Sequence, residues 1–218
     1  MTRKTPPYVP GSGATASGIA VAAARLIADE GFDYATAKRR AAQELLGDRA
    51  ANRTVLPNNA AIESELRRHL RLFGGDEHPA RLAALRREAL AWMHRLRQFN
   101  PHLAGAVLNG TATAFSDIQL HLFADSAKDV EIFLVNEGVE FRADDGDEEP
   151  GGPVERLRFD AGRRAGGVGL VVSVFETDAI RVAPRGRSRG AELHPVEASG
   201  RASIAQLTSL LDALEAPS

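Results

Sequence analysis

The chain contains no cysteine among its 218 residues. This absence excludes disulfides, thiolate nucleophiles, cysteine-based zinc sites and iron–sulfur clusters. Lysine is also scarce: nearly every basic residue is arginine, and the exceptions are Lys4, Lys38 and Lys128. We attribute this bias, together with the abundant alanine and glycine, to a GC-rich bacterial genome and not to a selected binding surface.

Long hydrophobic runs are missing as well, since none approaches the roughly 18 residues that cross a bilayer. The apolar segment 14–28 follows two basic residues, as in a signal peptide. However, Arg25, Asp29 and Glu30 interrupt it and no cleavage site follows, so we predict an amphipathic helix. The formal net charge of −2 gives no general attraction to nucleic acid or anionic membranes. We expect a cytoplasmic protein that contacts neither of them.

The spacing of apolar residues changes near Pro101 and divides the chain into regions. Residues 1–13 are rich in proline, glycine and serine and predict a flexible arm. In the region 14–100, apolar residues recur every three to four positions, which predicts four helices. These helices are expected to end near Gly31, Gly47, Gly74 and Phe99.

In the region 101–218 the spacing becomes two, which is typical of strands. Helices are expected after Asp125 and at 203–214, and strands at 104–108, 117–123, 139–143, 155–160 and 168–176. The expected fold class is therefore α+β, with a helical N-terminal region followed by a mixed sheet and its flanking helices.

The candidate site begins with a turn between the first two predicted strands. This turn contains Gly110 and Thr111, and Ser116 and Asp117 begin the strand that follows. Small residues after a strand let backbone amides approach a triphosphate, and an acid at the next strand can hold Mg²⁺.

On the second strand, Gln119 and His121 alternate with apolar residues, so the polar side chains share one face. This alternation alone is equally typical of a half-buried strand without a function.

The order of these elements resembles the nucleotidyltransferase fold, in which a strand that ends in two small residues precedes a strand with Asp-x-Asp. The resemblance spans residues 104–143. It implies that Gly110 and Thr111, with Ser116 beside them, face the phosphates, and that Asp117 holds Mg²⁺. Gln119 stands where the family has its second carboxylate.

The resemblance also implies a third carboxylate on a neighbouring strand, which would orient the acceptor hydroxyl as a base. Glu140 is the nearest match and Asp160 is the alternative, and either could equally be a surface acid. Because Gln119 is neutral, we expect a protein that binds a magnesium–nucleoside triphosphate with weak or lost transferase activity.

A broader resemblance covers most of residues 20–140. The runs at 26–46 (LIADEGFDYATAKRRAAQELL) and 75–82 (GDEHPARL) resemble a family of small proteobacterial proteins. Members of that family often carry the label UDP-N-acetylmuramate–alanine ligase. Such a ligase needs a Gly-Lys-Thr phosphate loop, and this chain contains no Gly-Lys-Ser/Thr, so the resemblance groups the chain without implying ligation.

Two alternative functions are also considered. One is a non-enzymatic scaffold whose helical region binds a partner. The other is DNA recognition, because residues 22–36 resemble the first helix and turn of tetracycline-repressor-type helix-turn-helix domains. A polar loop that contains Pro57 stands where the recognition helix should follow, which disfavours the DNA-binding hypothesis.

Overall fold

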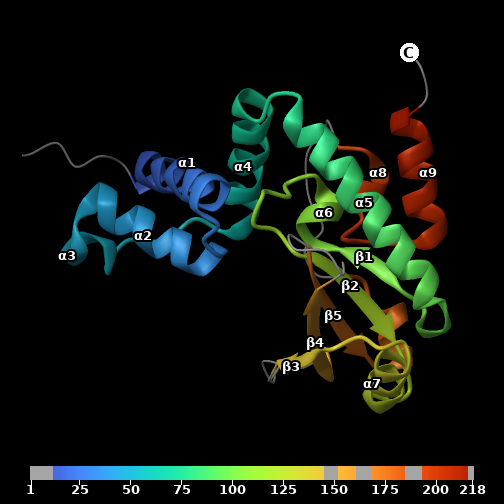
Figure 1. Ribbon diagram of the computed structural model, residues 1–218. Coiled ribbons are helices and arrows are strands. Elements are labelled where there is room, and N and C mark those ends of the chain that lie inside the picture. The colour runs from blue at the N-terminus through green and yellow to red at the C-terminus, as the bar shows by residue number, and fades with distance from the viewer. Residues whose placement is uncertain (1–11, 145–151, 161–167, 185–192, 216–218) are drawn as a thin grey trace, which may run out of the picture. The chain divides into compact units, whose positions relative to one another are not determined.

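The computed structural model describes residues 12–144, 152–160, 168–184 and 193–215 (Figure 1). The chain divides into two compact units, Met1–Phe73 and Gly74–Ser218, and each has its own hydrophobic core. The sequence pattern placed the end of the helical region at residue 100. The division falls earlier because α5 (Glu77–Arg95) buries Leu85, Trp92 and Met93 in the core of the second unit. Most of the predicted arm 1–13 lies outside the described residues.

The first unit consists of helices, as predicted. These are α1 (Ser12–Glu30), α2 (Tyr34–Leu46), α3 (Asp48–Ala51) and α4 (Asn59–Phe73). The Asp33 carboxylate begins α2 by accepting the amides of Ala35 and Thr36 at 2.9 and 3.0 Å, which satisfies donors that have no partner within the helix. The core includes Ile19, Ala23, Leu26, Ala41, Ile62 and Leu66. The short α3, which buries no residue, was not predicted.

The second unit is built on a mixed sheet. Within the described residues, its six strands follow the order β3-β4-β5-β2-β1-β6. Strands β2 and β5 are parallel and every other neighbouring pair is antiparallel. The bounds are β1 His102–Ala104, β2 Ile118–Phe123, β3 Arg142–Asp144, β4 Glu155–Asp160, β5 Gly169–Phe175 and β6 Arg201–Ser203.

Two predicted strands are corrected by the structure. The strand at 104–108 was wrong: β1 ends at Ala104 and α6 (Gly105–Asn109) follows it, because Gly105 turns the backbone with φ 69°. The strand at 139–143 is confined to Arg142–Asp144. The chain leaves α7 (Ala127–Asn136) through Gly138, at φ 70°, and Val139 still donates its amide to the Leu134 carbonyl.

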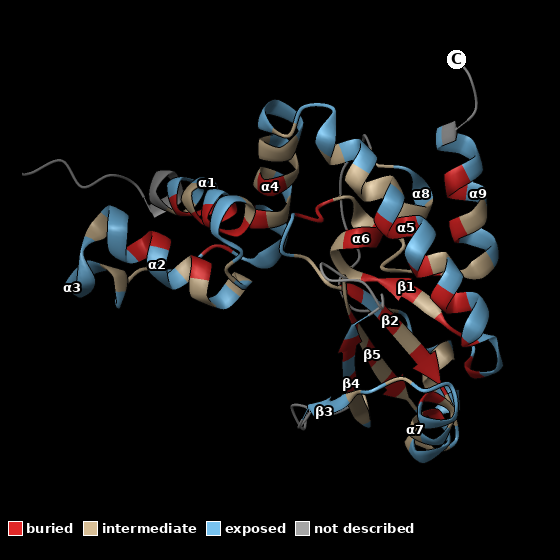
Figure 2. Ribbon diagram, viewed as in Figure 1, coloured by how far each residue is buried: buried red, intermediate tan, exposed pale blue. Residues whose placement is uncertain are grey.

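Helices pack against one face of this sheet and form the core of the second unit. Side chains from α5, α6, α7 and α9 (Ile204–Glu215) meet the apolar residues of β2, β4 and β5. Figure 2 shows the buried positions of these elements in red. The buried strand residues are Ile118, Leu120, Leu122, Leu157, Phe159, Leu170, Val172 and Val174. Among the described residues, no helix is long and apolar enough to cross a bilayer.

The strand residues that alternate with this core point to the opposite side, which we call the polar face. Its members on β2, β4 and β5 are Gln119, His121, Arg156, Arg158, Val171 and Ser173. The strand register aligns Arg156, Ser173 and His121 in one row and Arg158, Val171 and Gln119 in the next.

A buried ion pair joins the helices above the sheet. Arg86 of α5 is 1% exposed and donates to the carbonyls of Val107 and Leu108 in α6, at 3.0 and 2.9 Å. It also contacts Glu197 of α8 (Pro195–Ala198) at 2.6 Å. The two hydrogen bonds from Arg86 satisfy α6 carbonyls that the short helix leaves without helical partners.

Candidate functional site

The predicted phosphate-facing turn is packed within the second unit. Gly110 ends α6 with φ 82°, and Thr111 is 1% exposed. The Thr111 hydroxyl donates to Asn109 Oδ1 at 2.7 Å, and a Cβ at Gly110 would lie 3.6 Å from Glu197 Oε1. The Ser116 hydroxyl accepts the Thr113 amide at 2.9 Å. These contacts therefore fix the conformation of the connection from α6 to β2.

The glycine that approaches the second strand is Gly105. It follows β1 directly, and a Cβ at this position would overlap Gln119 Oε1. Gln119 also pairs in register with Ala104. Gly105, which Ala106 follows, therefore approaches β2 closely. This approach was not predicted, although an isolated glycine within an apolar strand pattern is a signal of close backbone approach.

Asp117 lies just before β2, over the polar face. Its Oδ2 accepts a hydrogen bond from Arg158 Nη1 at 2.9 Å, and the two side chains are 32% and 56% exposed. A Cβ at Gly169 would overlap Asp117 Oδ1, so the absence of a side chain there makes room for the carboxylate. The predicted metal ligand therefore has a guanidinium as its partner.

Asp160 lies in the same row as Asp117. It pairs with Gly169 across β4 and β5, while Ile118, the neighbour of Asp117, pairs with Leu170. Because strands are spaced by about 4.8 Å, the backbones of Asp117 and Asp160 lie about 10 Å apart. These two acids flank Gly169, and Arg158 stands beside them.

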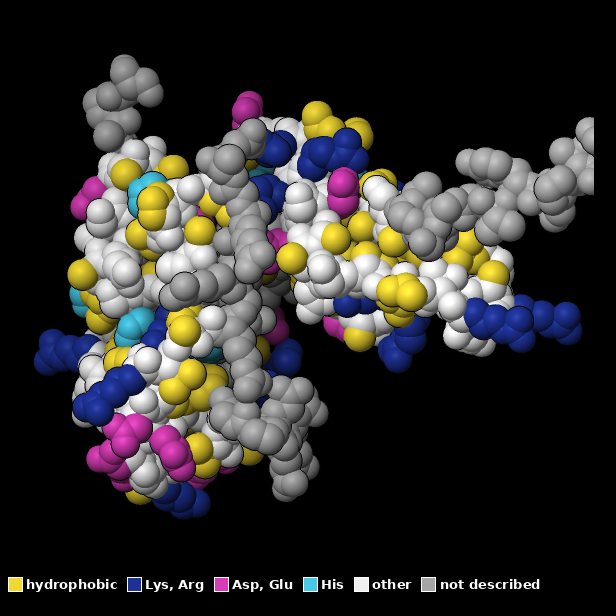
Figure 3. All heavy atoms as spheres, turned by 180° about the vertical axis from the view of Figure 1, so that it is seen from behind, with side chains coloured by type: hydrophobic (Ala, Val, Ile, Leu, Met, Phe, Trp, Pro, Cys, Tyr) yellow, Lys and Arg dark blue, Asp and Glu magenta, His cyan; other side chains and the backbone are white. Residues whose placement is uncertain are grey.

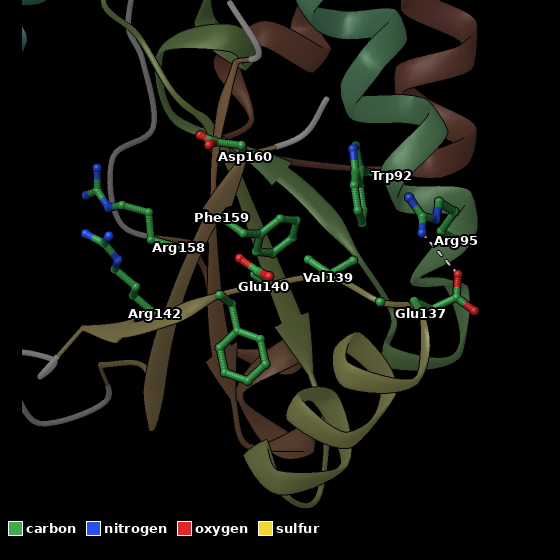
Figure 4. A pocket seen from close by; sticks show the side chains of 11 residues that line it. Trp92, Arg95, Glu137, Val139, Glu140, Arg142, Arg158, Phe159 and Asp160 are labelled. Carbon is green, nitrogen blue, oxygen red and sulfur yellow. Dashed lines mark hydrogen bonds and ion pairs between the residues drawn. The ribbon is translucent and has the colours of Figure 1, made fainter. Parts of the chain in front are cut away.

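Glu140 and Asp160 line a common cavity of about 630 Å³, which begins where the pairing of β3 with β4 ends. Figure 4 shows Trp92 next to Phe159, with 5.0 Å between the ring centres, and Arg142 beside Arg158 on the other side of the cavity. The Arg95–Glu137 ion pair, at 3.0 Å, closes the end near α5. The cavity thus brings the two alternative acids together with Arg158, the partner of Asp117.

These residues are a poor fit to a two-metal centre. Within the described part of the chain, no group of three or more histidine, aspartate or glutamate side chains is placed to hold a metal ion. Asp117 is paired with Arg158, and Gln119 adds an oxygen but no charge. The arrangement suits an anion bound by arginine better than a pair of divalent cations.

A second cavity, of about 280 Å³, opens on the polar face. His121, Phe123, Phe175, Arg156 and Arg201 contribute to its lining. Burial, and then the positive charges of Arg201, His102 and Arg156, lower the pKa of His121 to about 4. His121 is therefore neutral near pH 7. Seen from behind, the second unit shows hydrophobic, histidine and arginine side chains close together (Figure 3).

No family model, curated protein or solved structure matches this chain. The chemistry of the site therefore rests on its own residues.

Proposed function

We propose that this protein has a nucleotidyltransferase-like fold and binds a nucleoside triphosphate with weak or lost transferase activity. The observation that carries the proposal is the ion pair of Asp117 with Arg158 at 2.9 Å. The binding site would lie at the start of β2, between this pair and the Gly105–Gln119 contact.

The order of elements supports the fold proposal. A small pair, Gly105–Ala106, follows β1, the helix α6 comes next, and Asp117 precedes β2. The nucleotidyltransferase resemblance implies a small pair that precedes an acid-bearing strand, and this order is present here with α6 between the two.

The position of Arg158 favours nucleotide binding over nucleotidyl transfer. Two-metal transfer requires carboxylates that hold both ions and offset their charge, but Gln119 is neutral and Asp117 is already paired. An arginine can bind two phosphate oxygens through parallel N–H bonds, although it does not activate a nucleophile as a metal does. In any residual transfer, Asp160 is better placed than Glu140 to act as the base, because it shares a row with Asp117.

Calorimetric titration of ATP and GTP, each with Mg²⁺ and with EDTA, tests this proposal. We expect binding under both conditions. Arg158→Met should weaken it at least about tenfold, which is the loss of one charge-assisted contact. Arg97→Met is the control, because Arg97 is exposed and lines neither cavity.

Asp117→Asn distinguishes a carboxylate that pairs with Arg158 from one that binds Mg²⁺. If Arg158 binds phosphate, removing the competing charge should leave affinity unchanged or raise it. A magnesium site would instead lose affinity. The proposal fails if neither nucleotide produces heat, or if binding requires Mg²⁺ and is abolished by Asp117→Asn.

A further inference from the structure

The cavity on the polar face has the geometry of a site for a flat ring. The Phe175 ring is partly exposed in this cavity and stacks on the buried Phe123 ring, with 5.8 Å between the ring centres, and His121 lies 4.8 Å from Phe175. Small and apolar residues, including Pro153, Ala179, Val182 and Pro184, complete the lining. Stacking on aromatic faces is a common way to bind nucleobases.

The polar side chains of this cavity are mainly hydrogen-bond donors. The guanidinium groups of Arg156 and Arg201 carry only donor atoms, whereas the neutral His121 ring provides one donor and one acceptor. Arg201 is held in place, since it donates to the Ile180 carbonyl and its guanidinium lies 5.1 Å from the centre of the Phe123 ring. The described lining contains no carboxylate. A complementary ligand therefore presents acceptors.

Guanine meets this requirement better than adenine. Its O6 and N7 are two adjacent acceptors that an arginine contacts together, whereas adenine replaces O6 with an amino donor that faces the guanidinium unfavourably. At about 280 Å³, the cavity is slightly smaller than the usual range for whole ligands, so it suits a base better than a complete nucleotide.

The position of the cavity fits a ligand that continues to the Asp117–Arg158 pair. His121 lies four residues beyond Asp117 along the same strand, which is about 13 Å at 3.3 Å per residue. Gln119 lies between them on the polar face. This separation suits a nucleotide whose base and terminal phosphates occupy opposite ends of one face.

We propose that this cavity is the base subsite of the nucleotide site and selects guanine through Arg156, with the base stacked on the partly exposed Phe175 ring. The inference rests on the proposed nucleotide binding, and it adds the identity of the ligand and the residues that select it.

The test is calorimetric titration of GTP, ATP and inorganic tripolyphosphate into the full chain. Wild type should bind GTP about tenfold or more tightly than ATP, which is the usual discrimination by one arginine–guanine contact. Arg156→Met should remove this preference, while Arg142→Met, on the neighbouring strand but outside the lining, should retain it. Arg158→Met should weaken GTP, ATP and tripolyphosphate alike and leave the preference intact.

Circular dichroism verifies the fold of each variant, and Arg156→Gln replaces Arg156→Met if the latter does not fold. Equal affinity for GTP and ATP, or a preference for GTP that persists in Arg156→Met, would contradict the base subsite. Either result would leave the proposed nucleotide binding unaffected. Absence of binding by all three probes removes the proposed function itself. A single-stranded RNA oligonucleotide that binds much more tightly than GTP also overturns the inference, because the face would then bind nucleic acid.

Discussion

At the scale of residues, Arg158 gives the site its charge. It supplies a fixed cation beside Asp117, and Gly169 leaves space for the carboxylate. Further along β2, burial and neighbouring positive charge keep His121 neutral. The polar face therefore presents positive charge from arginine at neutral pH, with little from His121.

His121 should make stability depend on pH. Its pKa is about 4 in the folded protein and ordinarily 6.5, so the unfolded chain binds more protons between these values. Stability should fall as pH is lowered from 6.5 towards 4, by up to about 3 kcal/mol from this group. The facing groups are His102, Arg156 and Arg201.

Urea unfolding at several pH values measures this loss. His121→Gln should reduce the slope between pH 6.5 and 4, and the slope that persists would include contributions from His78 and His102, whose pKa values burial also lowers. An unchanged slope in His121→Gln would contradict the assignment.

The sequence predicted part of the strand geometry correctly at this scale. Alternation along β2 placed Gln119 and His121 on one face, because strand periodicity is a local property. The partners of these residues could not be predicted. Arg158 reaches Asp117 from 41 residues away, and its position depends on a strand order that periodicity does not encode.

At the scale of elements, α6 shows why an apolar run is ambiguous. Val107 and Leu108 are buried, and a short buried helix and a buried strand have the same apolar sequence. Arg86 stabilises the helical conformation of this segment because it donates to the carbonyls of both residues. The arginine is 21 and 22 residues away, so the local pattern gave no indication of this contact.

Arg86→Leu should destabilise the second unit by about 3–5 kcal/mol, because it leaves Glu197 and two carbonyls without their buried partner. Arg95→Leu is the control. Its ion pair with Glu137 is 42% and 43% exposed, and its guanidinium lies 4.1 Å from the centre of the Trp92 ring, so the loss should be about 1–2 kcal/mol. Chemical denaturation compares the two variants, and equal losses would contradict a special role for the buried arginine.

At the scale of the whole molecule, the chain has two separate cores. The periodicity of α5 showed that one side of this helix is buried, but periodicity does not indicate which core receives it. This is why the sequence grouped α5 with the preceding helices. The scaffold and DNA-binding hypotheses for the helical unit stay predictions.

Separate cores predict separate responses to core mutations. Ile62 is fully buried in the first unit, so Ile62→Ala should cost about 2–5 kcal/mol there. Amide exchange in the second unit and nucleotide affinity should be unchanged. Hydrogen–deuterium exchange of the full chain measures both units together, with Leu120→Ala as the reciprocal control. Loss of protection throughout the chain in either variant would show that the cores unfold as one.

Within the part of the chain that the structure describes, the strands at the two edges of the sheet, β3 and β6, have three residues each, and each carries an arginine. Edge strands this short offer few unpaired amides and carbonyls to another polypeptide. Their charged side chains also disfavour pairing with a hydrophobic strand. The sheet can therefore leave its polar face accessible to a ligand while its margins discourage self-association into aggregates.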